Sequence, residues 1–196
     1  LGNNKILDEL AKATNDISKG ELIQLDAISN KEISLKNLED ISYYKTGRLF
    51  EAAAKSGAIL ADADPKYIKN ITNCSKNLGI VFQIKDDLLD YSENGALIGK
   101  PVFQDLKEGK VTYPFYFANK NANDSEKIKL ESFLGKKNIN QKTVFKLISN
   151  LDGIRETEKL ALQYLKKAAK AANLIDDKNI SKEMIELVNS AMYRKK

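Results

Sequence analysis

The sequence predicts an all-α protein built as a helical bundle, and three observations support this. Apolar side chains recur three or four residues apart, as on one face of a helix. No stretch shows the strict alternation of apolar and polar residues that is typical of a half-buried strand. The residues that break helices gather at a few places, above all Gly95, Gly99, Pro101 and Gly109.

The first third of the chain is predicted to form two helices. Leu7, Leu10 and Ala11 follow the i, i+3, i+4 spacing, and Gly20 is expected to interrupt or loosen this helix. Ser34 is a suitable N-cap for a second helix, because its hydroxyl can accept a bond from a free backbone N–H. This second helix is expected to continue through Ile41, Lys45 and Leu49 to about Leu60.

The remaining elements follow from helix starts and breakers. Asp64-Pro65 should begin a helix that runs from about Lys66 to Asp90, since proline suits the first helical turn. Residues 92–109 are predicted to be a long loop with room for a short turn. Further helices are expected at Thr112–Phe117, Ser125–Leu134, Lys142–Leu151, Gly153–Asn173 and Ser181–Tyr193.

Composition excludes several kinds of chemistry. The sequence has no histidine, which removes histidine metal sites and serine–histidine triads. Its only cysteine, Cys74, has no partner for an internal disulfide and is expected to be a packing residue. The net charge of +5 is spread along the chain rather than gathered in a basic stripe, so no nucleic-acid partner is predicted.

The sequence contains no candidate membrane helix or signal peptide, and a cytoplasmic location is expected. No stretch approaches the roughly 20 apolar residues that a transmembrane helix needs. The chain begins Leu1-Gly2-Asn3 rather than with methionine, which suggests a trimmed protein or part of a longer one.

The informative segment is the end of the predicted helix Lys66–Asp90. At about 100° per residue, Gln83, Asp86, Asp87 and Asp90 share one helical face. Carboxylates this close repel one another, and they lie at the end of the helix whose dipole disfavours anions. A divalent cation such as Mg²⁺, which prefers oxygen ligands and bridges to phosphates, would neutralise them. An acidic surface patch is the alternative reading of the same pattern.

Two further segments could complete such a site. Lys45 and Thr46 precede Gly47 inside a predicted helix, where glycine costs about 1 kcal/mol relative to alanine, so a close approach is expected there. Gly99-Lys100-Pro101 lies in the glycine-rich loop that follows the aspartates. A loop of this kind could fold over a ligand and bring Lys100 to a diphosphate.

Taken together, these residues resemble the trans-polyprenyl diphosphate synthase family. Four strings occur in the order found in that family and cover about residues 20–114. They are Gly20-Glu21-Leu22-Ile23-Gln24, Lys45-Thr46-Gly47-Arg48-Leu49-Phe50-Glu51-Ala52-Ala53, Leu78-Gly79-Ile80-Val81-Phe82-Gln83-Ile84-Lys85-Asp86-Asp87-Leu88-Leu89-Asp90-Tyr91, and the pair Gly99-Lys100-Pro101 with Asp105-Leu106-Lys107-Glu108-Gly109-Lys110-Val111-Thr112-Tyr113-Pro114.

The resemblance implies roles for these residues. Asp86 would be a direct Mg²⁺ ligand, and Asp87 and Asp90 would act directly or through water. Lys45 and Lys100 would hold the allylic diphosphate. Lys45, Thr46 and Gln83 would line the reacting centre. The implied reaction is ionisation of an allylic prenyl diphosphate followed by attack of isopentenyl diphosphate.

The sequence also departs from the family. The family has two aspartate-rich motifs, and the motif here looks like the second; the first, and a basic site for isopentenyl diphosphate, are absent from these residues. Residues 1–196 are therefore predicted to be the carboxyl-terminal part of one all-α synthase domain, a partial isoprenoid synthase fold without the upstream helices. This polypeptide alone is expected not to elongate prenyl chains. The segment around Leu88-Leu89-Asp90-Tyr91 looks more like long-chain, octaprenyl-type synthases.

Two other functions remain open from sequence. A non-catalytic subunit or partner-binding helical fragment would have its apolar faces completed by another chain, and a homo-oligomer is expected on the same ground. A basic nucleic-acid-binding bundle is disfavoured by the aspartate stripe. Arg194 is expected to lie in a frayed tail, with closure over the site as the alternative.

Overall fold

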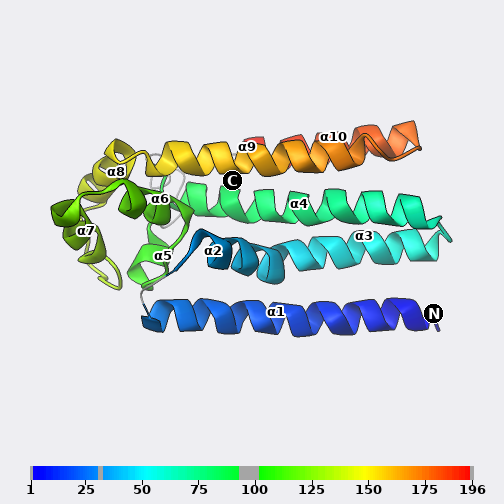
Figure 1. Ribbon diagram of the computed structural model, residues 1–196, viewed down its shortest axis with the longest axis horizontal. Coiled ribbons are helices and arrows are strands. Elements are labelled where there is room, and N and C mark those ends of the chain that lie inside the picture. The colour runs from blue at the N-terminus through cyan, green and yellow to red at the C-terminus, as the bar shows by residue number, and fades with distance from the viewer. Residues whose placement is uncertain (1, 31–32, 93–101, 195–196) are drawn as a thin grey trace.

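A computed structural model describes residues 2–30, 33–92 and 102–194, with the side chains of residues 29–30 left aside. Long helices lie side by side along the molecule, and the shorter helices α5–α8 gather at one end (Figure 1). Within the described ranges the chain forms helices and turns and no strand, so the predicted all-α bundle is confirmed. None of the described helices is long and apolar enough to cross a membrane.

The helices of the first half lie side by side, with α1 against α2 and α3, and α3 against α4 (Figure 1). Helix α1 covers Asn4–Asn30, α2 covers Leu35–Ser42, and α3 covers Arg48–Leu60. Ser34 is the N-cap of α2, as predicted, and its hydroxyl accepts a bond from the N–H of Asn37 at 3.1 Å. Helix α4 covers Pro65–Asp90, with the Asp64 carboxylate accepting bonds from two N–H groups of its first turn.

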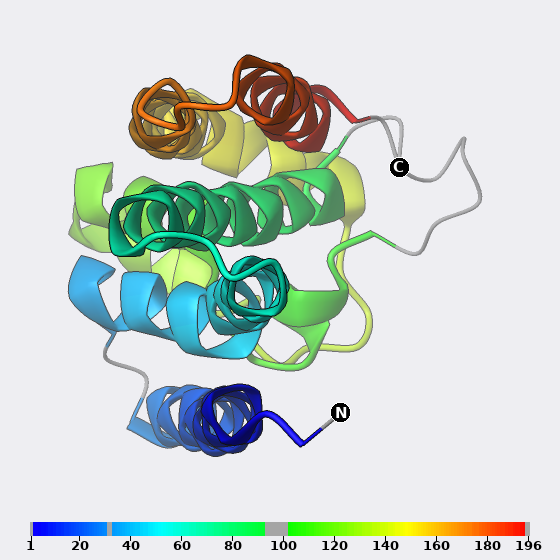
Figure 2. The ribbon, with the colours of Figure 1, turned by 90° about the vertical axis from the view of Figure 1, so that its right-hand side faces the viewer.

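The second half closes the bundle over α4. After the short helix α5 (Gln104–Lys107) come α6 (Tyr113–Asn121), α7 (Asp124–Glu131) and α8 (Gln141–Asn150). Helices α9 (Gly153–Ala172) and α10 (Lys178–Tyr193) then pack as a pair on the face of α4 opposite α3 (Figure 2). The predicted helices are all present, with ends displaced by a few residues.

Helix α4 forms the centre of the main core because it packs between neighbours on both sides. Cys74, Val81 and Ile84 are fully buried there, together with Ala168 and Ala172 from α9. The prediction that Cys74 is a packing residue is confirmed. Burial raises the pKa of the Cys74 thiol to about 11, so the group stays protonated at neutral pH.

The expectation that Gly20 interrupts the first helix is wrong, because α1 continues through it. A Cβ atom at Gly20 would lie 2.8 Å from Tyr44 Cβ and 2.9 Å from Lys45 Cγ. Glycine is needed there for the close packing of α1 against the segment that carries Lys45, and not to end the helix.

The helix expected to run from Ser34 to about Leu60 is continuous, but one of its turns is not α-helical. Tyr43–Gly47 form a π-helical turn between α2 and α3. Such turns carry one extra residue per turn and recur at functional sites. The predicted close approach at Gly47 is confirmed: a Cβ atom there would lie 3.2 Å from the Lys76 carbonyl oxygen, and one at Gly79 would lie 2.6 Å from Gly47 Cα.

A charged network ties α1 to α3. Arg48 and Glu9 are both buried, and Arg48 Nη1 lies 2.6 Å from Glu9 Oε1 in an ion pair that lacks the alignment of a hydrogen bond. Arg48 Nε donates to Asp16 at 2.8 Å, and Lys55 Nζ donates to Glu9 Oε2 at 2.6 Å. The buried charges of Arg48 and Glu9 are thus each paired with a charge of opposite sign on the neighbouring helix.

Candidate functional site

The carboxyl-terminal half of α4 carries the predicted acidic stripe, and the structure gives its members three different surroundings. Asp87 is buried, Asp90 is half-buried, and the Asp86 side chain is 45% exposed. Within the described ranges, no group of three or more Asp, Glu or Cys side chains is arranged to hold a metal ion. The shared face that the sequence predicts therefore exists, but the carboxylates on it do not converge as they stand.

Asp87 lies at the centre of a polar chain inside the bundle. Gln83 Nε2 donates to Asp87 Oδ1 at 3.0 Å, and the backbone N–H of Tyr113 donates to Oδ2 at 3.4 Å. Burial raises the pKa of Asp87 to about 7; the bonds from Gln83 and Tyr113 oppose that rise, and the neighbouring Asp105 charge adds to it. A carboxylate with so high a pKa is one whose negative charge is poorly neutralised.

The π-helical turn brings Thr46 into the same chain. Thr46 Oγ1 donates to Gln83 Oε1 at 2.7 Å, which leaves the Gln83 amide nitrogen free to donate to Asp87. The structure thus brings together Thr46, Gln83 and Asp87, three of the residues named from sequence. They come from positions 37 and 4 residues apart along the chain.

Asp90 faces the segment that returns after the loop. Its Oδ1 accepts a bond from the N–H of Gln104 at 2.9 Å, and its Oδ2 accepts one from the N–H of Asp105 at 3.2 Å. Burial raises the pKa of Asp90 to about 6, although these backbone bonds lower it. Asp90 therefore positions α5 beside the end of α4.

Asp86 is paired with the last described residue of the chain. Arg194 Nη2 donates to Asp86 Oδ1 and also to the Phe82 carbonyl oxygen at 3.1 Å. The Arg194 guanidinium carbon lies 3.7 Å from the centre of the Phe82 ring. The expectation of a frayed tail at Arg194 is wrong, because buried residues of α10 fix the point from which its side chain reaches α4.

Lys45 lines a small cavity beside this chain. Its ammonium lies 2.6 Å from Gln24 Oε1 and 2.9 Å from Glu21 Oε1, both on α1. The cavity has a volume of about 70 Å³ and is also lined by Gln83 and Asp87. Lys45 is thus placed near Asp87 across a common space. Lys100, the other predicted lysine, lies outside the described residues.

Two charged residues of this cavity received no role from sequence. Asp105 and Lys110 both line it, and their side chains lie 3.5 Å apart in an ion pair. Both lie in the segment Asp105–Pro114, which is one of the strings that resemble the family. That resemblance was the feature of the sequence that could have identified them. Their convergence on Asp87 required the fold, because 18 and 23 positions separate them from it in the sequence.

The donor chemistry of the stripe fits a divalent cation. Carboxylate oxygens are the ligands that Mg²⁺ and Ca²⁺ take in proteins. Among the described residues no salt bridge reaches Asp87 or Asp90, and burial has raised the pKa of both, so their negative charge lacks a cationic partner. Because the carboxylates of the stripe do not converge on one point, a bound cation would also need oxygen ligands from outside the stripe.

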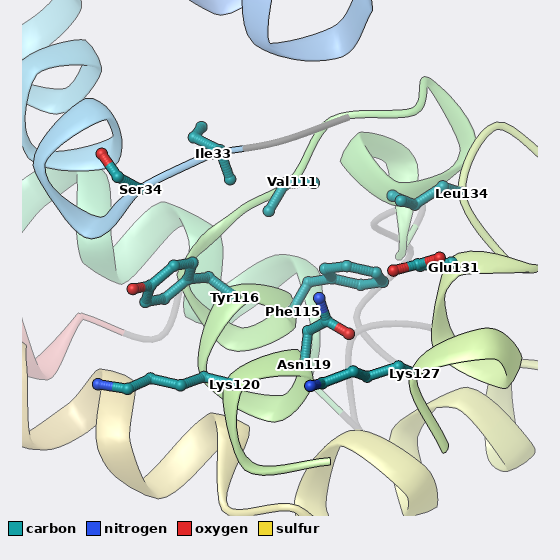
Figure 3. Close-up of a pocket in the computed structure, with 10 residues that line it drawn as sticks. All are labelled: Ile33, Ser34, Val111, Phe115, Tyr116, Asn119, Lys120, Lys127, Glu131 and Leu134. Carbon is teal, nitrogen blue, oxygen red and sulfur yellow. The ribbon is translucent and has the colours of Figure 1, made fainter. Parts of the chain in front are cut away.

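A larger cavity than the one beside Lys45 lies elsewhere. A groove of about 880 Å³ runs between the start of α2 and helices α6 and α7 (Figure 3). Its walls carry Ile33, Val111 and Leu134, and Lys120 and Lys127 lie along one edge. None of the residues predicted for the site lines this groove, so size alone does not mark it as the reactive cavity.

Comparisons with known proteins agree with this arrangement. The family model described as Polyprenyl synthetase matches residues 1–151. Octaprenyl diphosphate synthase of Escherichia coli is 42% identical over 118 residues, which is 60% of this chain and 36% of that protein. A prenyl transferase of Cyanidium caldarium is 29% identical over 196 residues, the whole of this chain and 60% of that protein. The chain spans between about a third and three fifths of these relatives' length.

Solved structures share the fold. Polyprenyl synthase from Caulobacter crescentus, complexed with calcium and isoprenyl diphosphate, superposes with a TM-score of 0.90 at 29% identity, over 99% of this chain and 60% of that one. A decaprenyl diphosphate synthase from Rhodobacter capsulatus gives 0.89 at 28% identity, over 97% of this chain and 60% of that one. The family model covers well over half of the sequence, and the chain belongs to the polyprenyl synthetase family.

Proposed function

We propose that this chain forms the carboxyl-terminal part of a trans-prenyl transfer domain and supplies the half of the reactive site that holds the allylic diphosphate. The observation that carries the proposal is the chain of hydrogen bonds from Thr46 through Gln83 to Asp87, beside Lys45. Lys45, Gln83 and the under-neutralised carboxylate of Asp87 line one cavity, and Thr46 donates a hydrogen bond to the Gln83 side chain.

The substrates under this proposal are an allylic prenyl diphosphate and isopentenyl diphosphate, with Mg²⁺ as the cofactor. Asp86 would hold Mg²⁺ directly, and Asp87 and Asp90 would do so directly or through water. Bound there, Mg²⁺ would supply positive charge to the diphosphate oxygens as the allylic carbon–oxygen bond breaks.

The side chains of this polypeptide bind and position the substrate. Lys45 would exchange its bonds to Glu21 and Gln24 for the diphosphate, and Lys100 would approach the same group. A fixed ammonium beside the departing diphosphate stabilises charge that grows as ionisation proceeds. Thr46 and Gln83 would line the side of the reacting carbon, held in place by their mutual bond.

The test is diphosphate binding by the purified 196-residue chain. Isothermal titration with inorganic diphosphate in the presence of Mg²⁺ should give saturable binding that Lys45→Ala weakens about tenfold or more, since one charge-assisted bond is lost. Lys159→Ala is the matched control, because that exposed lysine pairs with Glu156 on α9. Equal binding by both variants would remove the role of Lys45.

A second measurement addresses turnover. We propose that this polypeptide by itself does not lengthen prenyl chains, because its 196 residues hold only one aspartate motif. Incubation with farnesyl diphosphate, isopentenyl diphosphate and Mg²⁺ should release no longer product. Chain extension by the purified polypeptide would show that one aspartate motif is enough. A long-chain product and a cytoplasmic location belong to the same proposal for the whole protein.

Association with another chain is a second candidate role, and α1 favours it. Leu7, Leu10 and Leu22 on this helix are 59%, 46% and 67% exposed. Apolar side chains gathered on one helix are typical of a surface that a partner covers. We expect self-association, which light scattering of the purified chain would detect as a mass above 21.9 kDa.

A further inference from the structure

Arg194 occupies the place where a cation would meet the acidic stripe. Its guanidinium donates to Asp86 Oδ1, the carboxylate to which the proposed function gives direct metal contact. Within the described part of the chain, this is the one salt bridge made by any of the three aspartates. The negative charge of Asp86 is therefore paired with the positive charge of Arg194, 108 positions further along the chain.

The side chain of Arg194 is held in place by more than its charge. Its Nη2 atom also donates to the Phe82 carbonyl oxygen at 3.1 Å, and its guanidinium stacks on the Phe82 ring at 3.7 Å. The Arg194 side chain is only 20% exposed. Its Nε is buried without a hydrogen-bond partner, which is a cost that the other three contacts must offset.

The start of this side chain is fixed by α10. Val188, Ala191 and Met192 of that helix are buried against the core, and the backbone N–H of Arg194 donates to the Ser190 carbonyl at 3.0 Å. The arginine therefore leaves the end of a packed helix at the level of Phe82 and Asp86. A guanidinium in that position and a divalent cation on Asp86 would compete for the same carboxylate oxygen and would repel each other.

We propose that Arg194 is a built-in counter-cation of the site, which pairs with Asp86 in the cation-free protein and is displaced when a divalent cation binds there. The inference rests on the proposed function, because it takes Asp86 to be a metal ligand. Under this proposal, the Arg194 side chain is held against α4 only when the acidic stripe holds no cation. Binding of the cation at one end of α4 is in this way linked to release of the end of α10.

The experiment is a titration of the 196-residue chain with Mn²⁺, followed by electron paramagnetic resonance. Mn²⁺ accepts the same carboxylate ligands as Mg²⁺. Arg194→Gln keeps a planar group that can still donate to Phe82 but carries no charge. The Arg194→Gln variant should bind Mn²⁺ about fivefold more tightly than the wild type, because a partly exposed ion pair no longer competes with the cation.

Two further variants isolate the contact. Arg155→Gln makes the same change of charge at an exposed arginine that pairs with Asp152, and its Mn²⁺ affinity should match the wild type. In a chain that already carries Asp86→Asn, adding Arg194→Gln should change the affinity by less than about twofold, because the shared carboxylate is gone. Thermal melts of each variant establish that it is folded.

The wild-type chain gives a measurement that needs no substitution. The ¹⁵N resonances of the Arg194 guanidinium, identified by their loss in Arg194→Gln, should shift on addition of Mg²⁺, while those of Arg155 stay in place. Unchanged or weaker Mn²⁺ binding by Arg194→Gln would overturn the exchange while leaving the metal site. Absence of Mn²⁺ binding in every chain would instead remove the proposed metal site, and the exchange with it.

Discussion

Gly79→Ala tests the close crossing that positions the site. In the structure, a Cβ atom at Gly79 would lie 2.6 Å from Gly47 Cα and 3.2 Å from Gly47 N, and both of those atoms are backbone. Ordinary contact between carbon atoms begins at about 3.5 Å, so α4 and the π-helical turn would have to separate by about 1 Å. Overpacking of this kind costs about 1–3 kcal/mol.

The net effect follows from two opposing contributions. Replacing a helical glycine by alanine stabilises a helix by about 1 kcal/mol, which offsets part of the overpacking. We expect Gly79→Ala to lower the free energy of unfolding by up to about 2 kcal/mol. For a chain of this length that corresponds to a melting temperature lower by up to about 8 °C. Separation of the helices would also lengthen the bond between Thr46 and Gln83 and weaken diphosphate binding.

The assay is thermal unfolding followed by circular dichroism, with Gly57→Ala as the matched control. Gly57 lies in α3 with no atom within 4 Å of a built Cβ, so only the gain in helix propensity should remain there. That variant should melt about 2–4 °C above the wild type. If Gly79→Ala melts as high as Gly57→Ala, the two backbones do not meet as closely as described, and the reasoning fails.

Two pH-dependent predictions follow from the buried carboxylates. Burial raises the pKa of Asp87 to about 7, so the folded state holds its proton more firmly than the unfolded state and loses stability as pH rises from about 4 to 7. Asp87→Asn in EDTA should therefore raise the melting temperature at pH 8 but not at pH 4; an equal gain at both values would contradict this. Burial works against Glu9, but Lys55 and Arg48 outweigh it and hold the pKa of Glu9 below its ordinary value. Its contribution is present above about pH 4.5 and is lost progressively as pH falls below that value, so Glu9→Gln should cost about 3 kcal/mol at pH 7 and steadily less as the pH is lowered, by urea unfolding at each pH.

Local patterns in the sequence were sufficient for the helices. The caps Ser34 and Asp64 act through atoms two or three residues away, so their effect can be read from neighbouring letters. The prediction that Gly20 interrupts the first helix failed because it relied on local sequence alone. The local cost of this glycine in a helix is visible in the sequence, whereas the contact with Tyr44 that favours it comes from another helix.

The candidate site was likewise predicted in part from local spacing, while its contacts depended on other helices. Spacing along one helix placed Gln83, Asp87 and Asp90 on a common face, and the quoted strings marked Lys45 and Thr46. Spacing did not reveal that each aspartate has its own partner. Those partners, Tyr113, Gln104 and Arg194, lie between 14 and 108 residues away and reach α4 only through the packing of other helices.

What the sequence determined by itself was the helical fold, the family resemblance and the residue types that carry the chemistry, because each depends on composition or on periodicity within one segment. Only the tertiary structure decided the π-helical turn, the joining of Asp105 and Lys110 to the cavity, and the pairing of Asp86 with Arg194. The physical reason is that burial and charge neutralisation depend on which helices pack together, and this is settled by the whole bundle at once.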